Sequence, residues 1–81
     1  MSYSRTIPSH ITPTFEKDEN NSAYIYVERT VPYSYTHTLQ EWPMINLDLG
    51  ENDEVIGIEL VGFDIDDLDL NKALELAGFA K

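Results

Sequence analysis

The chain contains no cysteine. Disulfide cross-links, thiolate metal sites and cysteine nucleophiles are therefore excluded. Basic residues are scarce as well: 5 Lys and Arg stand against 15 Asp and Glu, which gives a formal net charge of −10. Because nucleic acids and anionic membranes are bound by positive surfaces, this balance argues against direct binding to either. We expect the charge to aid solubility and to attract a basic partner or a cation.

Long apolar runs are also missing. The opening segment, MSYSRTIPSH, lacks the apolar core of a signal peptide, and no segment approaches the ~20 apolar residues that span a bilayer. We therefore expect a cytoplasmic protein. Its 81 residues allow one small domain, 1–81, with a single core. Because small domains without disulfides often gain core by self-association, we expect a homodimer.

Alternation of apolar and polar residues predicts a β-hairpin over residues 12–28. In AYIYVER, the three aliphatic residues share one face and the two tyrosines share the other, which is typical of a half-buried strand. The turn-forming segment DENNS connects this strand to the alternating segment ITPTFEK. Residues 1–10 carry no periodic signal and are predicted to form a loose arm.

A second hairpin is predicted in INLDLGENDEVIGIEL. The turn GEND fits a short connection, in which Gly50 and Asn52 tolerate positive φ. The predicted register places the Ile and Leu residues on one face and sets Gly57 opposite Asn46. A glycine at that position suggests a bulge or the close approach of another segment.

The remaining patterns predict a further strand and a helix. TVPYSYTHTLQEWP has a period of two, which favours a strand followed by an irregular corner at residues 40–43, although a loop over residues 31–43 stays open as the alternative. Helical spacing begins at residue 65 and predicts a helix over residues 65–78, with aspartates capping its start and Gly78 ending it. The predicted fold is α+β: an antiparallel sheet built from two hairpins and an extra strand, with one C-terminal helix packed on it.

Two segments resemble a known family. DENNSAYIYV and INLDLGENDEVIGIELVG are similar to small bacterial and phage proteins grouped as domain of unknown function 2283. In that family an Asp-Ala-Leu-Tyr-Ile strand precedes an acidic turn and then Val-x-Gly-Ile-Glu. The matching residues are Ala23, Tyr24, Ile25, Asp48, Val55, Gly57, Ile58 and Glu59. Phe15, Asn21 and the turn GEND depart from the pattern. The resemblance implies an α+β fold and supplies no activity.

Acidic residues gather in two segments that could in principle hold a cation. An EF-hand reading of the twelve residues that begin at Asp48 fails, because Gly50 and Asp53 stand where an acidic residue and a glycine are needed. A weak divalent site in the turn and a magnesium site before the helix stay open, but turn formation and helix capping explain both segments. We predict no metal and no cofactor. The candidate acidic surface comprises Glu51, Asp53, Glu54, Asp64, Asp66, Asp67 and Asp69.

An aromatic sheet face is the strongest candidate for an interface. Strand parity and the aromatic content of residues 24–42, including His37, predict rings on the face opposite the aliphatic core. Glu59 on that face could act as an acid or base, and we favour instead an ion pair with Arg29 or a lysine. The candidate interface comprises Tyr24, Tyr26, Tyr33, Tyr35, Trp42, Gly57 and Glu59. No catalytic residue is predicted.

Three functional hypotheses follow from these patterns. The favoured one is a non-enzymatic protein-interaction module, homodimeric through a sheet edge or the aromatic face. The second is a small acidic inhibitor or nucleic-acid mimic of the type that phages direct against host proteins, in which the acidic surface occupies a basic groove. The third is a weak divalent-metal-dependent enzyme that uses the acidic cluster.

Overall fold

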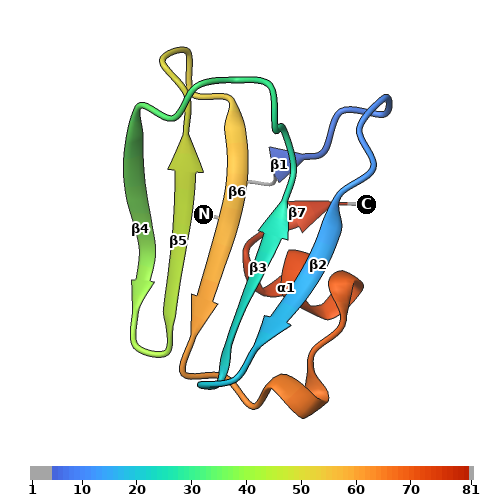
Figure 1. Ribbon diagram of the computed structural model, residues 1–81, viewed down its shortest axis with the longest axis vertical. Coiled ribbons are helices and arrows are strands. Elements are labelled where there is room, and N and C mark those ends of the chain that lie inside the picture. Colours follow the sequence, from blue (N-terminus) through green and yellow to red (C-terminus); the bar gives the residue numbers. More distant parts are fainter. Residues whose placement is uncertain (1–4, 81) are drawn as a thin grey trace.

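The computed structural model describes residues 5–80 and has a five-stranded antiparallel sheet at its centre. The strands lie in the order β2-β3-β6-β5-β4 (Figure 1). Their bounds are β2 Thr14–Asp18, β3 Ser22–Tyr26, β4 Tyr35–Glu41, β5 Met44–Leu49 and β6 Val55–Val61. One C-terminal helix, α1 (Leu70–Leu76), packs on the sheet. The predicted α+β fold is therefore confirmed.

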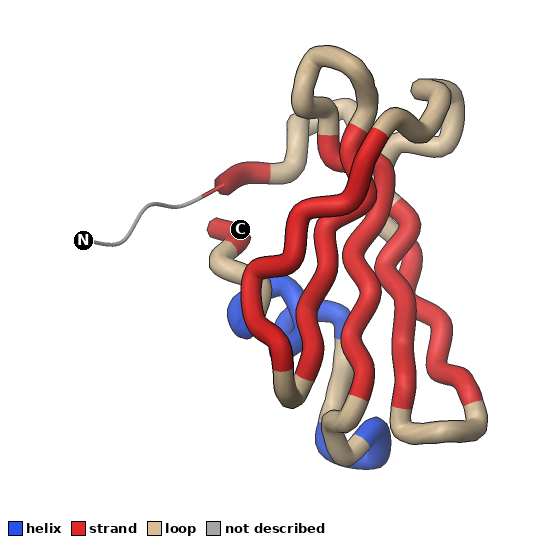
Figure 2. Tube along the Cα trace, turned by 90° about the vertical axis from the view of Figure 1, so that its left-hand side faces the viewer, coloured by secondary structure: helices blue, strands red, loops and turns tan. Residues whose placement is uncertain are grey.

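The core lies between the sheet and α1, and strand alternation builds it. Side chains of β3 and β5 alternate between buried and half-buried along each strand, so that one face of each is apolar. The largest fully buried side chains, each at most 2% exposed, are Ile25, Ile45, Leu47, Ile58 and Leu60. Ala73 and Leu74 of the helix and its C-cap residue Ala77 join the same cluster. The helix thus covers one face of the sheet only (Figure 2).

The register of the β5–β6 hairpin differs from the predicted one by two residues. Asp48, and not Asn46, lies opposite Gly57. The shift arises because the connecting loop is longer than a tight turn and because β6 carries one extra residue, Ile56, between its pairings with Asp48 and Leu49. Beyond the bulge a shift of two residues leaves each side chain on its own face, so Ile45, Leu47 and Ile58 face the core as predicted. Before it, the prediction is wrong: Val55 pairs with Leu49 and packs against the core, and Ile56, expected on the core face, is the bulged residue. The left-handed conformation falls on Asp53, with φ of 65°, and not on the Gly50 and Asn52 of the prediction.

Strand β4 is the extra strand predicted in the middle of the chain. Residues 27–34 cross the top of the sheet to reach it, and β4 then pairs with β5 at the edge (Figure 1). The strand extends to Glu41, so that the corner occupies only Trp42 and Pro43 and not all of residues 40–43. A bulge at Leu39 interrupts the pairing and turns this side chain towards the core.

The predicted helix over residues 65–78 is wrong as a continuous element. A single 3-10 turn, η1 (Ile65–Asp67), is separated from α1 by the extended residues Leu68 and Asp69. The break has a physical cause, because short acidic side chains compete with helical bonding by capping free amides. The Asp64 carboxylate accepts from the amide of Asp66, and the Asp69 carboxylate accepts from the amide of Lys72.

The two ends of the described chain meet, which corrects the prediction of a loose arm over residues 1–10. Strand β1 (Arg5–Thr6) pairs in parallel with β7 (Phe79–Ala80), and Ile7 and Ile11 pack against the core. Residues 1–4 of that predicted arm lie outside the described residues. Gly78, with φ of 84°, ends the helix as predicted and turns the chain into β7. Within residues 5–80, no helix has both the length and the apolar character needed to cross a membrane.

Candidate functional site

The sheet face opposite α1, here called the outward face, carries mostly polar and aromatic residues, half-buried or exposed, together with the buried Gly57 and the apolar Met44 and Val61. Alternation along the five strands brings them to one side. They are Thr14, Glu16 and Asp18 of β2, Ser22, Tyr24 and Tyr26 of β3, Gly57, Glu59 and Val61 of β6, Met44, Asn46 and Asp48 of β5, and Thr36, Thr38 and Glu41 of β4. The outward face contains four of the seven predicted interface residues, namely Tyr24, Tyr26, Gly57 and Glu59.

A hydrogen-bonded network crosses four strands of the outward face, from β3 over β6 and β5 to β4. The Tyr24 hydroxyl on β3 donates to Asp48 Oδ2 on β5, at 2.6 Å, and thereby spans β6. The Thr36 hydroxyl on β4 donates to Asp48 Oδ1 at 2.9 Å. Asp48 thus holds partners from both sides through charge-assisted bonds, which are stronger than neutral ones.

Gly57 is the reason why Tyr24 can reach across β6. A Cβ atom at Gly57 would lie 2.0 Å from the Tyr24 hydroxyl oxygen and 2.4 Å from two ring carbons. The tyrosine ring therefore lies directly on the glycine backbone, and a larger residue would displace it. The close approach inferred from the presence of a glycine in this strand is confirmed, and the approaching group is the Tyr24 side chain.

The environment of Tyr24 favours its neutral form. Partial burial of the ring, followed by the hydrogen bond to Asp48 and the charge of that carboxylate, raises the pKa of Tyr24 well above its ordinary value of 10.0. The hydroxyl is therefore a fixed donor at neutral pH. It orients the ring and keeps one Asp48 oxygen occupied.

Glu59 lies beside this network and has a different partner from the predicted one. Its Oε1 accepts from the Asn46 amide at 3.1 Å, and the Thr38 hydroxyl pairs with Asn46 Oδ1 at 2.8 Å. Arg29, the expected ion-pair partner, instead donates to the Thr14 hydroxyl at 2.9 Å. The predicted pairing with Arg29 is therefore wrong, because the guanidinium group is directed to the β2–β3 side of the face.

Two tyrosine rings of β3 and Arg29, which follows that strand, form a contiguous cluster. The centroids of Tyr24 and Tyr26 lie 4.7 Å apart with an interplanar angle of 60°. The Arg29 guanidinium carbon lies 4.3 Å from the Tyr26 ring centroid, which is within cation–π range. A hollow of about 370 Å³ lies next to the rings, and its charged lining residues are Glu16, Asp18, Glu59 and one cation, Lys17. The outward face therefore offers aromatic surface together with carboxylates.

The prediction that all the aromatic residues share this face is wrong for Tyr35 and His37. They pair with Leu49 and Leu47, so they lie on the helix side of the sheet. They remain exposed because β4 is the edge strand and the core does not extend beneath it. Tyr35 donates to the Asp53 carboxylate.

The other two predicted aromatic residues lie at the periphery. The Tyr33 hydroxyl is 2.8 Å from the Thr36 hydroxyl, at the β4 end of the network, and the side chain is 61% exposed. Trp42 is 72% exposed in the β4–β5 turn and lies over Gly62, where a Cβ would be 2.9 Å from the indole ring. Neither residue belongs to the central cluster, although both add aromatic surface at its margin.

The candidate acidic surface does not form one patch. Glu51, Asp53 and Glu54 lie in the β5–β6 loop, whereas the aspartates of residues 64–69 follow the opposite end of β6 (Figure 1). Seven strand residues separate the two groups, a distance of about 20 Å. Among residues 5–80, no three His, Asp or Glu side chains are grouped so as to hold a metal ion. The roles found for Asp64 and Asp69 are the predicted ones, helix capping.

The outward face has its own strong negative charge. Its carboxylates are Glu16, Asp18, Glu41, Asp48 and Glu59, and Arg29 is the cation stacked on it. Sequence parity placed several of these side chains correctly. The Asp48 and Arg29 contacts were missed because they depend on the cross-strand register and on the course of the chain after β3. A register with Asp48 opposite Gly57 would have suggested the Tyr24–Asp48 bond.

Comparison with known proteins yields one match. The model of a family described as protein of unknown function (DUF2283) matches residues 18–63, which run from the end of β2 to just past the end of β6. The matched segment therefore contains β3, β4, β5 and β6, the strands that carry the hydrogen-bonded network. No curated protein and no solved structure matches the chain.

Proposed function

The chain belongs to the DUF2283 family of proteins of unknown function, and we propose that it is a non-enzymatic interaction module whose outward face binds a basic protein partner. The observation that carries the proposal is the coincidence of fixed tyrosine rings and carboxylates on the sheet face that α1 leaves uncovered. Tyrosine supplies large contact area at a low cost in side-chain entropy and is enriched at protein interfaces.

The charge of the outward face decides the class of partner. Five carboxylates and one guanidinium group would repel a nucleic acid and would attract lysine and arginine side chains. A second copy of the chain stacked on the same face would oppose five carboxylates to five. Charge complementarity therefore favours a basic partner on this face over a face-to-face homodimer.

The polar groups of the face support a binding role over catalysis. Tyr24, Asp48, Asn46 and Glu59 hydrogen-bond to other side chains of the face, which fixes their orientation. Such satisfied networks make a rigid surface. Five strands spaced by ~4.8 Å and about six residues long give a face of roughly 500 Å², which suits a transient contact. We propose accordingly that partner binding is reversible and sensitive to salt.

Capture from lysate with charge-matched variants tests this proposal. The immobilised double variant Glu16→Gln/Glu59→Gln removes two charges from the outward face and keeps the Glu59 acceptor for Asn46. The control Asp66→Asn/Asp67→Asn removes two charges at η1. We expect the parent chain and the control to retain a basic protein at about 50 mM salt, at which exposed charges are weakly screened, and the face variant to lose it. Equal loss in both variants, or loss only in the control, would refute the outward face as the binding surface and favour the acidic-inhibitor hypothesis.

Homodimerisation through the β4 edge is a second candidate, supported by the composition of that strand. Strand β4 lies at the edge of the sheet. When His37 is counted as neutral, Glu41 is the only charged residue among the seven of this strand. Exposed edges with few charges are templates for strand pairing. Light scattering at low micromolar concentration should then give twice the chain mass, and His37→Lys should return the protein to the monomer. A monomeric parent chain would exclude this mode of association.

A further inference from the structure

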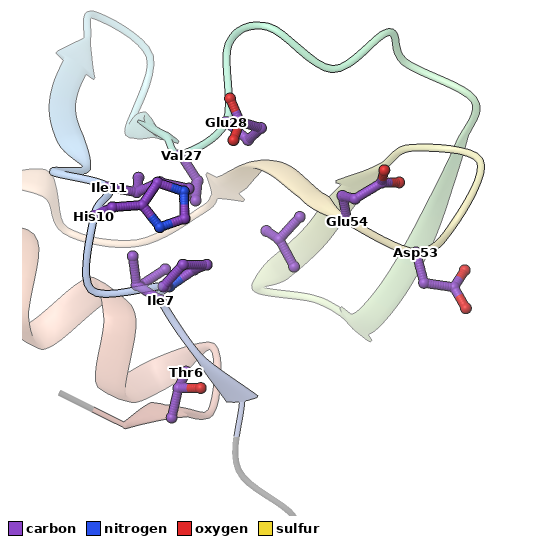
Figure 3. A pocket seen from close by; sticks show the side chains of 10 residues that line it. Thr6, Ile7, His10, Ile11, Val27, Glu28, Asp53 and Glu54 are labelled. Atoms are coloured by element: carbon purple, nitrogen blue, oxygen red, sulfur yellow. The ribbon is translucent and has the colours of Figure 1, made fainter.

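A second site lies at the other side of the sheet, between the N-terminal arm and the β5–β6 loop. A cavity of about 340 Å³ opens there, lined by residues of the arm, of the end of β3 and of the loop (Figure 3). This volume is at the lower end of the range found for small-molecule sites. The cavity shares no lining residue with the hollow beside Tyr24 and Tyr26, so its occupant is independent of the partner proposed above.

The floor of the cavity is aliphatic. Ile7 and Ile11 come from the arm, Val27 follows β3, and Val55 begins β6. Val27 is a core residue, and the other three are partly buried against the core. The apolar surface that they leave in the cavity would be covered by an apolar ligand group, with a favourable transfer free energy.

The rim of the cavity is acidic. Glu28 lies above the floor, and Asp53 and Glu54 lie along the loop (Figure 3). Hydrogen bonds from Thr30, and to a smaller degree the charge of His10, hold the pKa of Glu28 below its usual range, so this carboxylate is ionised at neutral pH. Three carboxylates line the cavity against one basic side chain, His10, and neither Lys nor Arg is among the lining residues. Its charge is therefore complementary to a cation.

Each rim carboxylate is held in place by a bond to one oxygen. Glu28 Oε1 accepts from the Thr30 hydroxyl at 2.7 Å, Glu54 Oε1 accepts from the backbone N–H of Asn52 at 2.9 Å, and the hydroxyl of Tyr35 donates to Asp53 Oδ1. These contacts come from the loops and from the start of β4 and fix the carboxylates before any ligand arrives. Figure 3 shows the Asp53 and Glu54 carboxylates directed away from Ile7 and Ile11, so these two residues act on the cavity through their charge. Preorganised acceptors lower the entropic cost of binding.

From this combination we propose that the cavity binds a small alkylammonium ion, with its aliphatic stem on the isoleucine and valine floor and its ammonium group at the acidic rim. The aliphatic floor excludes a bare metal ion as the intended occupant, since a hard cation gains nothing from apolar surface. The carboxylates exclude an anionic or fatty-acid ligand, whose head group they would repel.

Titration of the isotopically labelled full-length chain with n-hexylammonium, followed by amide chemical shifts, tests the proposal. We expect millimolar binding with shifts concentrated in residues 6–11, 27–28 and 53–55. Two probes separate the contributions: 1-hexanol has a similar stem without the charge, and ethylammonium has the charge with a short stem. Both should bind several-fold more weakly, because one loses the rim and the other loses most of the floor.

Two variants and a matched control locate the charge. Asp53→Asn and Glu28→Gln keep the acceptors for Tyr35 and Thr30 and remove one charge each. Each should weaken n-hexylammonium binding about two- to fivefold, whereas Glu51→Gln in the same loop, outside the cavity lining, should leave it unchanged. Equal weakening by Glu51→Gln, equal binding of 1-hexanol, or shifts spread over all acidic segments would overturn the proposal. A lysine peptide that binds the cavity when n-hexylammonium does not would overturn it too.

Discussion

Substitution of Gly57 by alanine tests whether the Tyr24 ring rests on the glycine backbone. In an unobstructed strand this change stabilises a protein by about 0.4–1 kcal/mol, because alanine restricts the unfolded chain. Here the new Cβ would lie 2.0 Å from the Tyr24 hydroxyl, so the ring must move. The strand therefore loses the bond from Tyr24 to Asp48 and the contact with Tyr26.

The two losses outweigh the gain. A hydrogen bond to a charged acceptor contributes about 1.5–3 kcal/mol, and an aromatic pair adds about 0.5–1.5 kcal/mol. Subtracting the benefit of alanine leaves a net destabilisation of about 1–4 kcal/mol for Gly57→Ala. For a domain of this size each kcal/mol lowers Tm by about 4–8 °C.

A double-mutant cycle measured by urea unfolding isolates the contact. In the Tyr24→Ala background the ring is gone, so Gly57→Ala should be neutral or stabilising. The coupling energy should then be at least about 1 kcal/mol, well above the ~0.5 kcal/mol expected of independent sites. If Gly57→Ala costs the same in both backgrounds, or if it does not destabilise the parent chain, the close packing of Tyr24 on Gly57 is refuted.

Three further predictions concern Tyr24, the helix cap and the core. The folded pKa of Tyr24 lies above its unfolded value, so the contribution of the Tyr24 hydroxyl to stability is complete below pH 10.0 and is lost as pH rises towards the folded pKa. Between pH 9 and pH 11, within roughly one unit of the ordinary tyrosine pKa, Tyr24→Phe should therefore lose less unfolding free energy than the parent chain. Asp69→Ala should cost about 0.5–2 kcal/mol through loss of the cap on Lys72, whereas Asp66→Ala should change stability by less than about 0.5 kcal/mol in the same urea assay. Ile58→Val, at a fully buried position, should cost about 0.5–1.5 kcal/mol without changing the urea m-value.

The architecture was predictable because strand periodicity depends on burial of one face, and this pattern is local in the sequence. The alternation around Ile25 and Ile45 placed both side chains correctly on the core face. Register was less predictable, since it depends on loop length and on the bulge at Ile56, neither of which changes the hydrophobic pattern. Beyond the bulge a two-residue shift preserves the faces and is invisible to periodicity, whereas at Val55 and Ile56 the bulge reverses them.

The C-terminal segment shows where helical spacing misleads. Ile65 and Leu70 fall at positions that suit one helix, yet Asp64 and Asp69 cap separate turns, and Leu68 is buried between them. The pairing of β1 with β7 had no sequence signal, because two residues at each end of the chain are too few to show a period.

The candidate site was predictable in its residue types and less so in its contacts. Tyr24, Gly57 and Glu59 were expected on one face, and the structure brings them together there. Tyr35 was misplaced because an edge strand exposes both of its faces, so an exposed aromatic ring does not identify the outward one. The cavity at the N-terminal arm was missed because its walls come from three segments that are far apart in the sequence.

The most direct test of the central claim is chemical-shift mapping with the captured partner. The basic protein retained by the immobilised chain is purified and added to the isotopically labelled chain at low salt. The account predicts shifts at β2, β3 and β6, centred on Tyr24, Tyr26 and Glu59, and their disappearance at high salt. Shifts confined to η1 and the β5–β6 loop, or to the β4 edge, would contradict it.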